Sequence, residues 1–245
     1  MPWWSATCAA NVEKPVDRVD NPSLTCPLPG HGPVLGVFAK EPRAGRVKTR
    51  LTPPLTPRQA CQLYRVALRE TLARYAGGAV PLVLCAAGRQ AWFARAFPGM
   101  PLLPQGRGDL GARLARVTAR LFAAGAGPVA VAGSDSPDLP LALIKAAFAA
   151  LEAADAAVVP CRDGGYALLA LRRPAPALFA AMPWSTPELL PATQRRAAEV
   201  GLHLVTLGAW DDIDDFPALR RLVKRSPECM TAQHVRAHLD SLLSS

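Results

Sequence analysis

The sequence predicts one α/β domain, a three-layer α/β/α sandwich in which helices cover both faces of a mainly parallel sheet. From residue 33 onward, short apolar runs alternate with amphipathic helical patterns, which is the order of βαβ units. The apolar runs are continuous, as is typical of strands buried on both faces. The chain has 245 residues, half of them hydrophobic, which is enough for one large core; two small domains are the alternative.

The predicted elements follow one another in a regular order. The clearest helix is expected over residues 56–76. Thr56 is its predicted N-cap, Pro57 takes the first helical position, and Gly77 begins a Gly-Gly stop. Strands are expected at 33–39, 80–87, 101–105, 128–133, 156–161, 166–172 and 202–207. Further helices are expected at 89–97, 109–124, 139–154, 188–200, 216–224 and 231–243.

The first 32 residues are predicted to be an extension outside the domain, which then spans residues 33–245. The extension contains five prolines and shows neither helical nor strand periodicity, so we expect it to be poorly ordered. It lacks the basic start and apolar run of a secretion signal. Elsewhere no apolar run reaches the roughly 18 residues of a membrane span. We therefore expect a soluble, cytoplasmic protein without a membrane partner.

The six cysteines form no C-x-x-C pair and have no histidine at zinc-ligand spacing, which argues against a structural zinc site. Cys85 and Cys161 lie in or beside apolar runs. We expect both to be buried, reduced thiols, as suits a cytosolic protein.

A basic loop, FAKEPRAGRVKTRL at residues 38–51, follows the first predicted strand. Five basic residues between Lys40 and Arg50 face one acid, and they supply much of the formal net charge of +9. The loop lacks interleaved aromatic residues, so it fits a small polyanion such as a nucleotide diphosphate better than nucleic acid. We expect no nucleic-acid partner.

The position of this loop favours a phosphate-binding role, because ligands of such sheets bind beyond the carboxyl ends of the strands. Lys40, Arg43, Lys48 and Arg50 offer charge-assisted hydrogen bonds to phosphate oxygens, and Gly45 permits close approach of the backbone. The loop is neither a Walker A nor a G-x-G-x-x-G motif. The alternative is a solvated basic turn.

Two acidic loops predict a divalent metal site opposite the basic loop. Asp135 follows the strand at 128–133, and its alternative role is to cap the next helix. Four more acids lie between a predicted strand and a helix: Asp211, Asp212, Asp214 and Asp215. Mg²⁺ or Mn²⁺ commonly joins carboxylates to substrate phosphates, so these acids are candidate ligands. Asp215 is alternatively a helix N-cap.

Two further acids are candidate site residues. Asp163 lies in an Asp-Gly-Gly turn between two strands and either points into the same region or forms only a hairpin. Asp109 either caps a helix or meets a ribose or acceptor hydroxyl group.

Six motifs occur in order: FAKEPRAGRVKTRL, GDLGARL, GSDSPDLP, DGGYALLAL, PWSTPELL and DIDDFPAL. Together they resemble the bacterial GT-A-like transferase family labelled as arsenosugar-biosynthesis or radical-SAM-associated glycosyltransferases. That family is similar to the wider nucleotide-diphospho-sugar transferases, which include nucleotidyltransferases of the phospholactate guanylyltransferase type with a K-S-R-L element. The resemblance implies a GT-A-like (Rossmann-like) fold.

The resemblance also implies roles for individual residues. Lys48 and Arg50 would bind phosphates. Asp135 would hold the metal ion, with Asp214 as the second ligand and Asp212 as its rival. The sequence departs from the family pattern in having DSPD in place of D-x-D and DIDD in place of DIDT.

Three functions follow as hypotheses. The first is a metal-dependent glycosyltransferase that uses a nucleotide sugar and a small-molecule acceptor, with Mg²⁺ or Mn²⁺ on Asp135 and Asp214 and with Asp163 as the base that activates the acceptor. The second is a nucleotidyltransferase that joins a nucleoside triphosphate to a phosphorylated small molecule and releases pyrophosphate. The third is a non-catalytic nucleotide-binding protein. No feature of the sequence indicates an oligomeric state.

Overall fold

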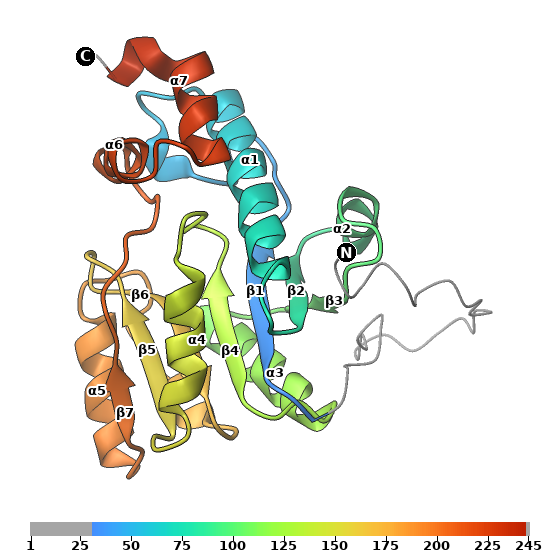
Figure 1. Cartoon of the computed structure of the whole chain (residues 1–245), viewed down its shortest axis with the longest axis vertical. Helices are drawn as coiled ribbons and strands as arrows, with labels where there is room; N and C mark the ends of the chain where they lie inside the picture. Colours follow the sequence, from blue (N-terminus) through green and yellow to red (C-terminus); the bar gives the residue numbers. More distant parts are fainter. Residues whose placement is uncertain (1–30, 244–245) are drawn as a thin grey trace, which may run out of the picture.

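A seven-stranded sheet forms the centre of the computed structural model, which describes residues 31–243 (Figure 1). Its strands are β1 Val34–Lys40, β2 Leu82–Ala87, β3 Leu102–Pro104, β4 Val129–Gly133, β5 Ala156–Pro160, β6 Tyr166–Leu171 and β7 Leu204–Thr206. They are ordered β3-β2-β1-β4-β6-β5-β7. Only β6 runs antiparallel to its neighbours, β4 and β5, because it follows β5 through a tight turn. The predicted mainly parallel sheet is therefore confirmed.

Helices cover both faces of this sheet and complete the predicted three layers. They are α1 Pro57–Ala76, α2 Gln90–Ala96, α3 Leu110–Ala123, α4 Leu141–Ala150, α5 Leu189–Glu199, α6 Phe216–Arg225 and α7 Met230–Leu243. Helices α1, α2 and α4 pack against one face, and α3 and α5 pack against the other. Side chains of β1 alternate between the two layers, since Leu35 and Val37 join the first core and Val34 joins the second.

Helix α1 shows how local sequence determines these elements. It begins where predicted, after Thr56, whose hydroxyl group accepts a hydrogen bond from the Gln59 amide at 3.3 Å. The Gln59 side chain accepts from the Thr56 amide at 2.9 Å, which completes a capping box. Two 3-10 helices, η2 Thr49–Leu51 and η3 Pro176–Leu178, were not predicted, because three residues are too few to show a period.

A third, smaller core lies at the amino-terminal end of α1, where α6 and α7 pack beside this helix (Figure 1). It contains Leu51 of the basic loop and Ile213, which lies among the acidic residues 211–215. Glu70 of α1 anchors the start of α7, since its carboxylate accepts hydrogen bonds from the Met230 and Thr231 amides, both at 2.8 Å. The basic loop and the acidic segment are therefore held by the same apolar cluster.

The predicted extension, together with Cys8 and Cys26, lies outside the described residues except at its end. The His31 ring contacts the Gly125 carbonyl oxygen at 3.1 Å, and the domain boundary at residue 33 stays a prediction. Cys85 and Cys161 are buried free thiols, as predicted. Among the described helices, none is long and apolar enough to cross a bilayer.

Candidate functional site

A pocket of about 450 Å³ lies at the carboxyl ends of β1 and β4. We call it the strand-end pocket. Five residues that the sequence analysis selected line it: Lys40, Lys48, Arg50, Asp135 and Asp214. The basic loop therefore does face acids from two distant segments, and the pocket combines cationic and anionic side chains.

Lys48 is the centre of the strand-end pocket. Its ammonium group lies 2.5 Å from Asp135 Oδ1, 2.5 Å from the Ile213 carbonyl oxygen and 3.7 Å from Asp214 Oδ1. The Lys48 side chain is only 5% exposed, whereas those of Asp135 and Asp214 are 41% and 36% exposed. A cation thus sits among three oxygen atoms, and the two carboxylates remain accessible to a ligand.

Backbone contacts bring these residues together. The Ile213 amide donates a hydrogen bond to the Asp135 carbonyl oxygen at 2.8 Å, which joins the loop after β4 to the acidic segment. Arg50 Nη1 contacts Asp214 Oδ2 at 3.2 Å. Leu51 follows Arg50 in the chain and Ile213 precedes Asp214, and both apolar side chains are buried in the third core. Their packing therefore holds the Arg50–Asp214 ion pair in place.

The four acids of the segment at 211–215 have different roles. Asp215 is the N-cap of α6, where it accepts a hydrogen bond from the Ala218 amide at 2.7 Å, so its alternative interpretation is correct. Asp211 is buried and forms ion pairs with three arginines. Asp214 lines the strand-end pocket, and Asp212 lies in a separate cluster beside Asp163.

Asp138, the second acid of the DSPD motif, has a structural role. Arg225 donates to its two oxygens at 2.8 and 3.0 Å, and Trp210 and Ser226 donate at 3.2 and 2.7 Å. The Asp138 side chain is 2% exposed. The motif therefore contributes only Asp135 to the pocket. Asp135 does not cap α4, whose N-cap is Pro140.

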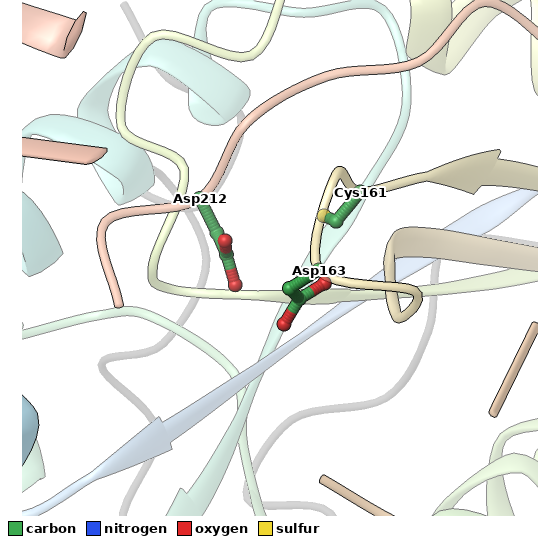
Figure 2. Close-up of side chains that lie close together, drawn as sticks. All are labelled: Cys161, Asp163 and Asp212. Carbon is green, nitrogen blue, oxygen red and sulfur yellow. The ribbon is translucent and has the colours of Figure 1, made fainter. Parts of the chain in front are cut away.

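Asp163, Asp212 and Cys161 form the second acidic cluster (Figure 2). One ligand atom of each side chain lies within 4.8 Å of the others. Asp163 also makes the predicted turn, since its carboxylate accepts from the Gly165 amide at 2.9 Å. Burial, together with the nearby charges of Asp214 and Asp163, raises the pKa of Asp212 from 3.8 to about 7. Among residues 31–243, no basic side chain forms an ion pair with Asp212.

Replacing Asp212 with Asn is expected to stabilise the metal-free protein at pH 8 by about 1–3 kcal/mol and to have little effect at pH 4. The raised pKa means that the folded state binds more protons than the unfolded state between pH 4 and 7, so the wild type loses stability as the pH rises through this range. Urea unfolding with a chelator present measures the difference. Asp109→Asn is the control, because Asp109 is an exposed N-cap and Asn also caps helices. A difference in unfolding free energy between wild type and Asp212→Asn that does not change with pH would contradict the expectation.

Three predicted residues have other contacts. Arg43 lies outside the strand-end pocket and pairs with Glu41 at 2.9 Å. Gly45 adopts a φ of 74° in a turn, and no atom lies within 4 Å of where a Cβ would be, so the turn itself explains this glycine. Asp109 caps α3 by accepting from the Ala112 amide at 2.8 Å. Their binding roles stay predictions.

Several lining residues were not predicted. Tyr64 of α1 accepts a hydrogen bond from the Lys40 amide at 2.9 Å and lies 3.0 Å from the Ser134 hydroxyl, so it ties the ends of β1 and β4 together. Its place on the apolar side of α1 resembles that of an ordinary core residue. Arg113 and Ser185 also line the pocket. They lie in the GDLGARL and PWSTPELL motifs, but neither was selected there as a site residue.

The PWSTPELL segment reaches the site by packing over the Asp-Gly-Gly turn. Gly164 has a φ of 86°, and a Cβ there would lie 2.2 Å from the Pro187 carbonyl oxygen, so only glycine fits. The Leu190 amide donates to the Gly164 carbonyl at 2.9 Å. This close packing holds Ser185 at the edge of the strand-end pocket.

The sequence of residues 68–186 matches a family described as "Uncharacterized protein conserved in bacteria (DUF2064)". No curated protein matches the sequence. A crystal structure from Desulfovibrio desulfuricans G20, provisionally described as a nucleotide-diphospho-sugar transferase, is similar with 29% identity and a TM-score of 0.80. The match covers 88% of this chain and 97% of that one.

More distant structures share the fold. CMP:2-keto-3-deoxy-manno-octonic acid synthetase complexed with CTP matches with 15% identity and a TM-score of 0.52, over 80% of this chain and 98% of that one. A nucleotidyl transferase from Methanothermobacter thermautotroptrophicus matches with 16% identity and a TM-score of 0.52, over 79% and 96%. The narrower arsenosugar and radical-SAM label stays a prediction. The chain thus has the fold of nucleotide-diphospho-sugar transferases and nucleotidyltransferases, and its similarity to the Desulfovibrio protein extends to sequence.

Proposed function

We propose that the protein is a metal-dependent glycosyltransferase that takes a nucleotide-diphosphate sugar as donor and a small molecule as acceptor. The observation that carries this proposal is the meeting of Lys48 and Arg50 with Asp135 and Asp214 in one pocket. A diphosphate needs cationic partners, and a divalent ion that bridges it to the protein needs carboxylates. The similarity to the Desulfovibrio protein supports the same class.

The residues present fit a divalent ion. The ammonium group of Lys48 already lies among oxygens of Asp135, Asp214 and Ile213, so this place accommodates positive charge. Carboxylate and carbonyl oxygens are the ligands that Mg²⁺ and Mn²⁺ prefer. We propose Asp135 and Asp214 as the ligands, with Asp212 as the alternative to Asp214. When bound, the ion would neutralise negative charge on the leaving diphosphate.

The side chains of this pocket bind and orient the substrates. Lys48 and Arg50, with Lys40 beside them, donate to phosphate oxygens of the donor. Asp163 is the proposed base and takes the proton of the acceptor hydroxyl group; its exposed carboxylate lies beside Asp212, in the cluster that is separate from the strand-end pocket. Asp109, at the start of α3, is the proposed partner of the donor ribose.

Nucleotidyl transfer is the second candidate, because the cationic side chains of the basic loop exceed what two phosphates require. In that reaction a phosphate oxygen of the acceptor would form a bond to the α-phosphorus of a nucleoside triphosphate, and pyrophosphate would leave.

An activity assay distinguishes these functions. The purified protein is incubated with Mn²⁺ and panels of nucleotide sugars or nucleoside triphosphates. Release of a nucleoside diphosphate from one sugar donor is the expected result. Pyrophosphate released only from a triphosphate with a phosphorylated acceptor would replace the glycosyltransferase proposal by nucleotidyl transfer. Metal-dependent binding of a nucleoside diphosphate without turnover in either panel would favour a non-catalytic nucleotide-binding protein.

A further inference from the structure

A second cavity, of about 540 Å³, adjoins the strand-end pocket at the ends of β1 and β2. We call it the basic side pocket. Five basic side chains line it: Lys40, Arg43, Arg46, Arg89 and Arg113. They come from the end of β1, the basic loop, the N-cap of α2 and helix α3. Segments that are distant in the sequence thus direct positive charge to one cavity.

Glu41 is the single acid of the basic side pocket, and it is already neutralised. Its side chain is 4% exposed and accepts hydrogen bonds from Arg89 Nε at 2.7 Å, the Arg89 amide at 3.0 Å and Arg43 Nη2 at 2.9 Å. These bonds, chiefly those from Arg89, lower the pKa of Glu41 to about 2. The carboxylate therefore stays ionised and holds both guanidinium groups at the cavity wall.

The other three basic side chains are not neutralised by an acid of the described residues. No ion pair among residues 31–243 involves Lys40, Arg46 or Arg113. The remaining wall is formed by Ala87 and Gly88, so the cavity offers no aromatic ring on which a base would stack. Several guanidinium groups around an open cavity match the geometry and charge of a phosphate group.

The two cavities are contiguous, because Lys40, Arg46 and Arg113 line both. A ligand in the basic side pocket would therefore lie next to the diphosphate in the strand-end pocket. Five basic side chains gathered around one cavity repel one another, and a bound anion would relieve this repulsion.

We propose that the basic side pocket is a second phosphate-binding site, which receives a phosphoryl group beyond the two that occupy the strand-end pocket. The group belongs either to a phosphorylated acceptor or to a triphosphate donor. The proposal rests on the proposed function only in assigning the diphosphate to the neighbouring pocket.

Calorimetric titrations at constant ionic strength test the site. Nucleoside diphosphate and triphosphate are each titrated with Mg²⁺ present, and glycerol 3-phosphate is titrated into protein saturated with nucleoside diphosphate and Mg²⁺. Arg89→Gln should weaken the binding of the triphosphate or of glycerol 3-phosphate at least about tenfold and leave diphosphate affinity within about twofold. Weaker binding of the triphosphate would show that the site holds the third phosphate of the donor. Weaker binding of glycerol 3-phosphate would show that it holds the phosphate of the acceptor.

Two controls and a second variant make the result specific. Arg95→Gln removes the same charge from the exposed side of α2 and should change no affinity. Should Arg89→Gln fail to fold, Ala87→Glu places an acid in the cavity wall and should reproduce the loss while both arginine partners of Glu41 are kept. Glycerol, which lacks the phosphate, should not bind.

If Arg89→Gln weakens the affinities for diphosphate and triphosphate equally, the proposal is overturned, because the cavity would then belong to the diphosphate site. Unchanged affinities in both variants would overturn it as well. If the wild type binds no nucleoside diphosphate, the proposed function fails; binding of inorganic phosphate that Arg89→Gln and Ala87→Glu weaken would still support the second site.

Discussion

Asp135→Asn is expected to abolish the metal-dependent stabilisation of the protein by a nucleoside diphosphate. Asn keeps the size of the side chain but removes the charge that a divalent ion requires. For the wild type, ligand at about 100 times its dissociation constant adds about 2.7 kcal/mol, which raises the melting temperature of a domain of this size by roughly 5–10 °C. The variant should show less than about a tenth of the metal-dependent affinity.

Thermal unfolding with and without Mn²⁺ measures this effect. Asp135 is 41% exposed, and the buried Lys48 ammonium group keeps the Ile213 carbonyl oxygen and Asp214 as neighbours, so the replacement should change the stability of the ligand-free protein by less than about 1 kcal/mol. Glu199→Gln removes an exposed charge at the end of α5 and serves as the control. An unchanged metal response in Asp135→Asn would remove Asp135 from the site.

Arg225→Met is expected to destabilise the protein by about 3–5 kcal/mol. The change leaves the Asp138 carboxylate, 2% exposed, without the guanidinium group that contacts both of its oxygens. It also removes a contact with the Trp210 ring, whose centroid lies 4.8 Å from the guanidinium carbon. Such a loss would lower the melting temperature by roughly 6–20 °C.

Urea unfolding at pH 7 measures the loss. The double variant Arg225→Met with Asp138→Asn should recover part of it, because the uncompensated buried charge is then absent. Arg221→Met, whose side chain is 43% exposed, should cost less. A loss below about 1 kcal/mol in Arg225→Met would show that the buried pair contributes little to stability.

The Asp138–Arg225 pair also bears on the site, since it joins the loop after β4 to the end of α6. Asp135 precedes Asp138 by three residues, and Asp214 lies just before α6. We therefore expect Arg225→Met to weaken nucleotide binding as well as stability.

Much of the fold could be predicted because its signals are local. The capping box of Thr56 and Gln59 and the continuous apolar runs act within a few residues of one another. Element boundaries agree to within a few residues for this reason. The sequence could not show that α6 and α7 form a core with Leu51 and Ile213, because that contact depends on side chains far apart in the chain.

The acidic segment shows the limit of sequence reasoning most clearly. Its four aspartates look alike in sequence but differ in the structure. Asp211 forms buried ion pairs, and Asp212 has a raised pKa. Asp214 faces Lys48, and Asp215 caps a helix. Their roles are set by partners from other elements. Arg89 and Arg113 were missed for the same reason, since only the fold brings them to the basic side pocket.

The amino-acid sequence by itself determined the order of strands and helices and the place of the basic loop after the first strand, since periodicity, caps and residue type act locally. The tertiary structure decided which carboxylates meet that loop. Lys48 reaches the Ile213 carbonyl across 165 positions of the chain, and a contact of that range depends on how the sheet and the third core bring the segments together.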